Sequence, residues 1–374
     1  MERIRIMRET FREYYPLSRE EHKLIWNKAI IVFDTNVLLN FYRYSPNTFQ
    51  TFSKILNMLS NKIWIPFQVA EEVHAYRLSV IDNQIKIYYE YRKKLDKLQK
   101  DFENEIKSPF ISKLLLSETK DGFNKIKEEL LVKEQFFKNL IQNDNILDTI
   151  SNIFDKKIGR PLSKQEFQTI LIKEGEKRFD NKSLALFMND NSTSSDRYND
   201  LMLWFQLIKK AQSDKCPILF ITDEIKNDWW IQSESKTFLP NYNLLREFYK
   251  MTGELFYIYR TFNFLEYAKT FIKDGIDESV MNEVKQFSSN EQMVYIEIKN
   301  DKNKNLNKLL EMITNDGYDI FQQNSKNDIV FLQIILPNIN DIFESFINKL
   351  KTYSSLTDID VIHVSSVVSR SIEE

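Results

Sequence analysis

The feature that most constrains the fold of this chain is a set of short, almost uninterrupted apolar runs. These runs alternate with longer helical patterns. The runs are AIIVF at 29–33, IWIP at 63–66, CPILFITD at 216–223 and ELFYIYR at 254–260. Such runs are typical of strands buried on both faces of a parallel sheet. Helical segments follow the first two runs, and the order strand, helix, strand, helix predicts an α/β domain with a central parallel sheet.

The 374-residue chain is long enough for two domains. We expect the α/β domain to span residues 1–275, with a helical hairpin inserted at about 75–150, where Lys, Glu and Gln alternate with apolar residues at helical spacing. The hairpin is either a solvated structural element or a lid that carries basic residues over a substrate. Residues 285–374 show the order β-α-β-β-α-β of a ferredoxin-like α+β domain. We expect it to serve docking, oligomerisation or ligand sensing.

The amino-acid composition argues against several classes of enzyme. The six glycines stand apart, so no glycine-rich loop can hold a nucleotide phosphate. The chain has three histidines and one cysteine, and it lacks the motifs of serine hydrolases and zinc sites. It also lacks a signal-peptide pattern and a long apolar span, so we expect a cytoplasmic protein without a membrane segment. The net charge of −2 neither supports nor excludes a nucleic-acid partner.

Two acids directly follow predicted strands. Asp34 follows AIIVF, and Asp223 follows the strand that ends in FIT. Ligands of open parallel sheets bind at the carboxyl ends of the strands, which makes both acids candidates for a site. Either one alone is also explained as a turn or cap residue.

Helical periodicity adds two more acids. Val69, Val73 and Tyr76 predict an inward face on the helix after IWIP, with Glu72 at its edge and Glu71 facing water. In the later helix, Asp200 lies in the first turn, near the centre of the apolar stripe. That stripe is predicted to consist of Leu201, Trp204, Leu207, Ile208 and Ala211. An inward-facing acid is costly unless something cationic meets it.

Together, Asp34, Glu72, Asp200 and Asp223 would place four like charges at one edge of a sheet. Divalent cations would offset their repulsion, and carboxylate oxygens suit Mg²⁺ or Mn²⁺. One or two such ions activate water and stabilise the leaving oxygen of a phosphodiester, which would leave a 5′-phosphate and a 3′-hydroxyl. The pattern therefore favours metal-dependent phosphoryl chemistry.

Four motifs occur in an order that resembles the PIN-like domain nucleases, in particular a large bacterial branch with a helical insertion. They are DTNVLLNFYRYS, WIPFQVAEEVHAYR, RYNDLMLWFQLI and FITDEIKNDWW, and the similarity covers residues 1–270. The resemblance implies a three-layer α/β/α sandwich with a metal-dependent nuclease site. It places the four metal-binding and catalytic acids at Asp34, Glu72, Asp200 and Asp223.

The resemblance also implies supporting residues. Asn36 lies beside the first acid, Asp228 is an outer-sphere candidate, and Asp190 and Asp196 lie in the polar loop before Asp200. That loop lacks the Pro and Gly of relatives, Asn199 stands where they carry a Gly, and Glu224 replaces a common Asp.

Two basic residues, Arg43 and Arg77, match basic positions in the first and second motifs. Each is a candidate either to contact a nucleic-acid phosphate or to hold the acids in place. The alternative for both is a salt bridge with a nearby Asp or Glu.

The leading hypothesis is a Mg²⁺- or Mn²⁺-dependent endonuclease acting on RNA, as effector of a bacterial antiviral or toxin-like system, a role that rests on analogy. The alternatives are a nuclease for single-stranded or structured DNA and a catalytically silent nucleic-acid-binding scaffold. A phosphatase of the D-x-D-x-T type is disfavoured because Asn36 stands in place of the second Asp. The C-terminal domain is expected to bind a second copy or a regulatory partner.

Overall fold

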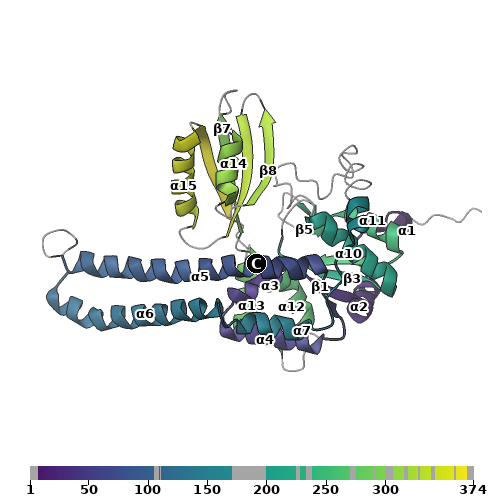
Figure 1. Cartoon of the computed structure of the whole chain (residues 1–374), viewed down its shortest axis with the longest axis horizontal. Helices are drawn as coiled ribbons and strands as arrows, with labels where there is room; N and C mark the ends of the chain where they lie inside the picture. Colours follow the sequence, from purple (N-terminus) through teal and green to yellow (C-terminus); the bar gives the residue numbers. More distant parts are fainter. Residues whose placement is uncertain are drawn as a thin grey trace, which may run out of the picture. The chain divides into compact units, whose positions relative to one another are not determined.

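The computed structural model divides the chain into two compact units, and many of their elements are labelled in Figure 1. The first unit comprises residues 30–161, and the second unit combines 1–29 with 162–374. The residues that the structure describes are 7–104, 109, 111–170, 199–224, 228–232, 238–269, 275–289, 291–299, 306–315, 319–326, 329–337, 342–357 and 359–368. None of the described helices is both long and apolar enough to cross a membrane.

The first unit starts with a parallel strand pair. Strand β1 (Ile30–Phe33) pairs with β2 (Ile63–Trp64), and α3 (Thr35–Leu39), η2 (Asn40–Tyr42) and α4 (Pro46–Met58) connect them. Ser45 caps α4 by accepting a hydrogen bond from the backbone N–H of Thr48, and Pro46 occupies the first turn, where a missing N–H costs nothing. Phe33 is fully buried and packs edge-on against Phe52 of α4. This packing fixes the end of β1, where the first candidate acid follows.

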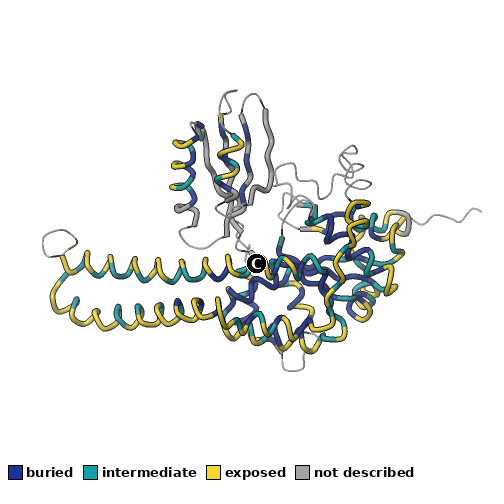
Figure 2. The backbone as a smooth tube through the Cα atoms, viewed as in Figure 1, coloured by how far each residue is buried: buried dark blue, intermediate teal, exposed yellow. Residues whose placement is uncertain are grey.

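A long helical hairpin forms most of the rest of this unit. It consists of α5 (Phe67–Phe102) and α6 (Lys113–Leu140), which run side by side in Figure 1 and are followed by α7 (Asn145–Ile153). Salt bridges between Arg92 and Glu134 and between Lys127 and Asp96 join the two helices. Figure 2 shows most of the hairpin as exposed or half-buried. Helix α5 begins at Phe67, in agreement with the helix predicted after IWIP, and continues without a break into the predicted hairpin.

The second unit contains another parallel strand pair, β3 (Ile218–Ile221) with β6 (Phe256–Tyr259). Strands β4 (Trp230–Gln232) and β5 (Phe238–Pro240) form a small antiparallel ribbon that the sequence patterns did not predict. The helices before the C-terminal sheet are α1 (Met7–Thr10), η1 (Arg12–Tyr14), α2 (Arg19–Lys28), α8 (Lys164–Thr169), α10 (Asn199–Asp214), α11 (Tyr242–Thr252), α12 (Thr261–Lys269) and α13 (Glu278–Ser289). Parallel strand pairs and abundant helices confirm the α/β class.

Helix α10 is buried on more sides than its sequence pattern predicts. All residues from Leu201 to Ile208 are buried, including Gln206, whereas the expected stripe contained every third or fourth residue. Aromatic residues enclose Trp204, which packs against Phe248 of α11 and Phe256 of β6. The five residues of the predicted stripe are all buried, and the burial extends beyond them to the other residues from Leu201 to Ile208.

The C-terminal part of the second unit has the predicted element order. It runs β7 (Glu291–Lys299), α14 (Leu306–Asn315), β8 (Asp319–Lys326), β9 (Ile329–Pro337), α15 (Ile342–Thr357) and β10 (Asp360–Val368). The strands form an antiparallel sheet in the order β10-β7-β9-β8. Its core includes Ile296, Ile298, Leu309, Ile313, Val330, Leu332, Ile334, Phe346 and Leu350. Alternate residues of β7 and β9 thus pack against both helices.

Candidate metal centre

Asp34 occupies the position directly after β1 and begins α3. One oxygen of its carboxylate accepts a hydrogen bond of 2.8 Å from the backbone N–H of Thr35, as expected of an N-cap residue. The other oxygen accepts one of 2.8 Å from the side-chain amide of Asn36. The side chain is buried, and its two carboxylate oxygens are held by different donors. A carboxylate oxygen has two lone pairs, so a hydrogen bond from a donor does not by itself prevent cation binding.

Glu72 lies in the second turn of α5, where it is half-buried. Its carboxylate accepts a hydrogen bond of 2.6 Å from the Thr35 hydroxyl and one of 2.9 Å from Gln68, one helical turn earlier. Glu71 is exposed, as the helix geometry predicts. The carboxylate of Glu72 is therefore directed towards the start of α3.

The predicted inward face of α5 was wrong at one position. Val69 and Val73 are buried, but Tyr76 is 45% exposed. The buried side continues instead through Val80 and Ile81. The error at Tyr76 does not affect the prediction for Glu72, because Glu72 lies beside the buried Val69 and Val73.

Thr35 connects the two acids and was not among the residues singled out from the sequence. Its backbone N–H donates to Asp34, and its hydroxyl donates to Glu72. Thr35 is itself buried; its bond to Asp34 is buried and its bond to Glu72 is partly buried. The sequence signal was its position between Asp34 and Asn36 in the motif DTN.

Asp223 follows β3 after one intervening residue and is buried. Its two oxygens accept hydrogen bonds from Thr261, one of 3.0 Å from the backbone N–H and one of 2.6 Å from the hydroxyl. Arg260 approaches the same carboxylate, with Nε 3.7 Å from Oδ1. Both partners follow β6, so the end of one strand orients the acid at the end of its neighbour.

Thr261 could have been found by the rule that identified Asp223. It comes directly after the residues ELFYIYR, at the carboxyl end of a predicted strand. A threonine hydroxyl carries no charge, so its position at a strand end is a weaker signal than that of an acid, although it can donate to a carboxylate.

The structure places the other candidate acids as follows. Asp200 lies in the first turn of α10, where it is half-buried, and Asp228 is half-buried in the turn before β4. Asp190 and Asp196 lie outside the described residues. Among the described residues, no group of three or more His, Cys, Asp or Glu side chains gathers as a metal site.

The two candidate basic residues have polar partners. Arg43 is exposed, and its guanidinium donates a hydrogen bond of 2.9 Å to the side chain of Asn40. Arg77 forms a salt bridge of 2.9 Å with Asp144, which also caps α7 and accepts a hydrogen bond from Tyr42. Arg77 thus joins α5 to α7 through a salt bridge, which is the alternative predicted for it from the sequence.

Asp34 and Glu72 suit a hard divalent cation. Mg²⁺ prefers oxygen ligands, keeps several water molecules, and needs only one or two protein carboxylates in addition to substrate phosphates. Asp34 and Glu72 share one hydrogen-bonding partner in Thr35, and a carboxylate oxygen, with two lone pairs, can accept from more than one donor or ion. The donors of the first unit therefore fit such an ion.

Comparison with known proteins identifies the family. No curated protein and no solved structure matches the chain. A family model described as a PIN-like domain matches residues 30–244, more than half of the chain. The matched segment begins with β1 and includes the candidate acids Asp34, Glu72, Asp200 and Asp223. This protein therefore belongs to the PIN-like domain family, whose members are generally nucleases.

Proposed function

We propose that this protein is a Mg²⁺- or Mn²⁺-dependent endonuclease that hydrolyses phosphodiester bonds in RNA. Membership of a nuclease family supports phosphodiester chemistry. The single observation that carries the proposal is the arrangement of Asp34 and Glu72 around Thr35. Two carboxylates that share a hydrogen-bonding partner supply oxygen ligands of the kind that a hard-cation site requires.

The side chains of the first unit orient the acids before any ligand binds. Asn36 and the Thr35 N–H fix the plane of the Asp34 carboxylate, and Gln68 with the Thr35 hydroxyl fixes Glu72. A bound divalent ion would supply activation of water and charge neutralisation at the phosphodiester. Preorganised acids avoid the cost of reorganisation when the substrate binds.

Asp200 and Asp223 are assigned to the same metal site by the family resemblance and by their positions in the chain. Asp200 begins α10 and Asp223 follows β3. We assign Asp228 an outer-sphere role, with Asp190 and Asp196 as further supporting acids. Thr261 and Arg260 orient Asp223, as Thr35 orients Glu72.

Substrate contacts are assigned to the basic residues of the first two motifs. Arg43 is exposed at the end of η2, nine residues after Asp34, and is proposed to contact a phosphate. For Arg77, the salt bridge with Asp144 supports a positioning role in the hairpin region. The preference for RNA and a role as a bacterial antiviral or toxin-like effector rest on the family resemblance.

The C-terminal sheet is proposed to be a ferredoxin-like accessory domain that binds a second copy of the chain or a regulatory partner. The strand order β10-β7-β9-β8 and the helices α14 and α15 support this assignment. A chain ending at Ser289 keeps α13, which packs against α12. We expect it to remain folded with a lower mass in solution or altered activity. Unchanged association and unchanged activity would argue against the assignment.

A nuclease assay with two neighbouring glutamates tests the proposal. Glu72→Gln removes the charge of the half-buried acid, and Glu71→Gln makes the same change at an exposed position one residue earlier. With Mg²⁺ or Mn²⁺ and tRNA, single-stranded RNA or single-stranded DNA as substrate, we expect Glu72→Gln alone to lose activity. Equal activity of both variants would reject the metal site, and cleavage of DNA alone would reject the RNA preference.

A further inference from the structure

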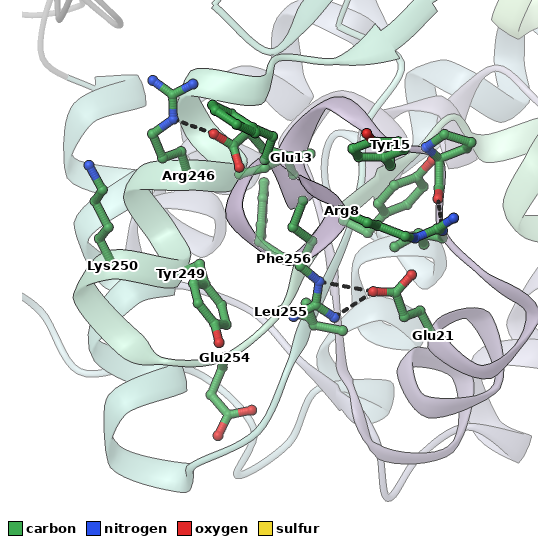
Figure 3. A pocket seen from close by; sticks show the side chains of 16 residues that line it. Arg8, Glu13, Tyr15, Glu21, Arg246, Tyr249, Lys250, Glu254, Leu255 and Phe256 are labelled. Carbon is green, nitrogen blue, oxygen red and sulfur yellow. Dashed lines mark hydrogen bonds and ion pairs between the residues drawn. The ribbon is translucent and has the colours of Figure 1, made fainter. Parts of the chain in front are cut away.

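A cavity of about 860 Å³ lies in the second unit, at the opposite end of β6 from Asp223. The N-terminal segment from Arg8 to Glu21 forms one wall, α11 forms another, and Leu255 and Phe256 form the floor (Figure 3). Because β6 leads from this floor to Thr261, the cavity is separate from the partners of Asp223. Its volume lies within the range typical of small-molecule sites.

Charged side chains surround the apolar floor, and acids are paired with only some of the basic residues. Two of the basic residues are held by acids: Arg12 donates two hydrogen bonds to Glu21, and Arg246 donates to Glu13. The remaining basic residues are Arg8 and Lys250, which are exposed and lie on opposite walls. Within the described residues, neither has a carboxylate partner. Their positive charges are therefore available to an anion.

The side chain of Arg8 is held in place by contacts that do not neutralise its charge. Its guanidinium donates a hydrogen bond of 3.1 Å to the carbonyl of Pro16 and lies over the ring of Tyr15. Neither contact cancels its charge. The guanidinium retains further N–H groups that can bind a phosphate, for which its planar geometry is suited.

Aromatic rings provide the second kind of contact. Tyr249, which is 49% exposed, lies on the α11 wall, and Phe11 and Tyr15 lie on the N-terminal wall. Arg12 covers Tyr249 at 5.6 Å from the ring centroid. Rings and guanidinium planes of this kind stack on nucleobases. Glu254, also in the lining, can accept hydrogen bonds from sugar hydroxyls or an exocyclic amine.

We propose that this cavity binds a nucleoside phosphate, either free or at the end of a nucleic-acid strand. The phosphate binds Arg8 or Lys250, the base stacks on the aromatic wall, and Glu254 accepts from the sugar or base. An inorganic anion would leave the rings and the floor unused, and an apolar ligand would leave both cations without a partner. A ligand that has a phosphate, a base and a sugar offers a partner to the cations, to the aromatic rings and to Glu254.

Calorimetric titration of the full-length protein in a metal-free buffer containing chelator tests this site. The probes are AMP, adenosine, inorganic phosphate and a 5′-phosphorylated RNA pentanucleotide. The variants are Arg8→Glu and Lys250→Glu, both at exposed positions, with Tyr249→Ala for the stacking contact. The matched control is Lys23→Glu, an exposed lysine of α2 outside the cavity lining.

We expect saturable binding of AMP or the pentanucleotide, at least tenfold weaker in Arg8→Glu or Lys250→Glu and unchanged in Lys23→Glu. Binding of AMP without the pentanucleotide identifies a free nucleotide, and the reverse identifies a strand end. Absence of saturable binding, equal binding by all variants, or phosphate binding as tightly as AMP would overturn the proposal. Because the chelator removes the divalent ions that the proposed nuclease site needs, binding to the cavity is measured independently of nuclease activity.

Discussion

The hydroxyl of Thr35 donates a 2.6 Å hydrogen bond to the carboxylate of Glu72, which lies 37 residues further along the chain. Through its backbone N–H, the same residue also donates to Asp34. A hydrogen bond to a charged group stabilises by about 1.5–3 kcal/mol, and this one lies on a buried residue. Thr35 thus couples the position of an acid on α5 to that of an acid after β1.

Replacing Thr35 by Val removes the hydroxyl but keeps the shape of the side chain. We expect kcat for RNA cleavage to fall by roughly ten- to a hundredfold, because about 1.5–3 kcal/mol of orientation is lost. Thr35→Ser keeps the donor and should retain activity. Steady-state kinetics across Mg²⁺ concentrations measure the effect. Wild-type kcat and unchanged Mg²⁺ dependence in Thr35→Val would show that the hydrogen bond has no role in the site.

Thr261 should contribute to stability through Asp223. The Thr261→Val variant leaves a buried carboxylate without its 2.6 Å donor, and we expect the free energy of unfolding to fall by about 1–3 kcal/mol. Thr261→Ser, which retains the hydroxyl, serves as the control. Urea denaturation followed by circular dichroism measures both. If Val and Ser variants are equally stable, the hydroxyl does not hold Asp223.

Glu134 should make the stability of the hairpin depend on pH. A hydrogen bond from Lys138 lowers its pKa below the ordinary 4.5, and Arg92 acts in the same direction against the opposing effect of burial. Because the pKa is lower in the folded state, ionised Glu134 stabilises the fold fully above about pH 4.5. That contribution disappears as the pH falls through the lower, folded-state pKa.

Urea unfolding from pH 7 to pH 3 tests this prediction. We expect Glu134→Gln to be less stable than wild type at pH 7, with the difference shrinking below about pH 4.5. The exposed Glu128 on the same helix provides the matched control, Glu128→Gln. A difference between wild type and Glu134→Gln that is constant over this pH range would contradict the assignment.

Sequence patterns predicted the strands of the two parallel pairs and the position of Asp34 at a strand end because both depend on local order. A buried strand requires a continuous apolar run, and an acid placed directly after it is delivered to the strand end, as Asp34 is. Helical periodicity placed Glu72 at the edge of the buried face, where it is half-buried, although the choice of Tyr76 for the same face was wrong. Periodicity fixes relative directions on a helix but not which side the core occupies.

The parts that could not be predicted depend on contacts distant in sequence. Asp223 and Thr261 are 38 residues apart, and their hydrogen bonds follow from the pairing of β3 with β6. The cavity likewise combines Arg8 with Lys250, and no local pattern links the two. The burial of every residue from Leu201 to Ile208 of α10 depends on aromatic neighbours such as Phe248, which a single helix does not reveal.

Cleavage of RNA by the Asp34→Asn variant tests the central claim most directly. Asparagine keeps the size of the side chain and an oxygen that can accept from the Thr35 N–H, so the fold should persist. With Mg²⁺ or Mn²⁺, we expect wild type to cleave single-stranded RNA, to stop when chelator is added, and to exceed Asp34→Asn by at least about a hundredfold. Equal cleavage by Asp34→Asn, or wild-type cleavage indifferent to chelator, would contradict a metal-dependent nuclease centred on Asp34.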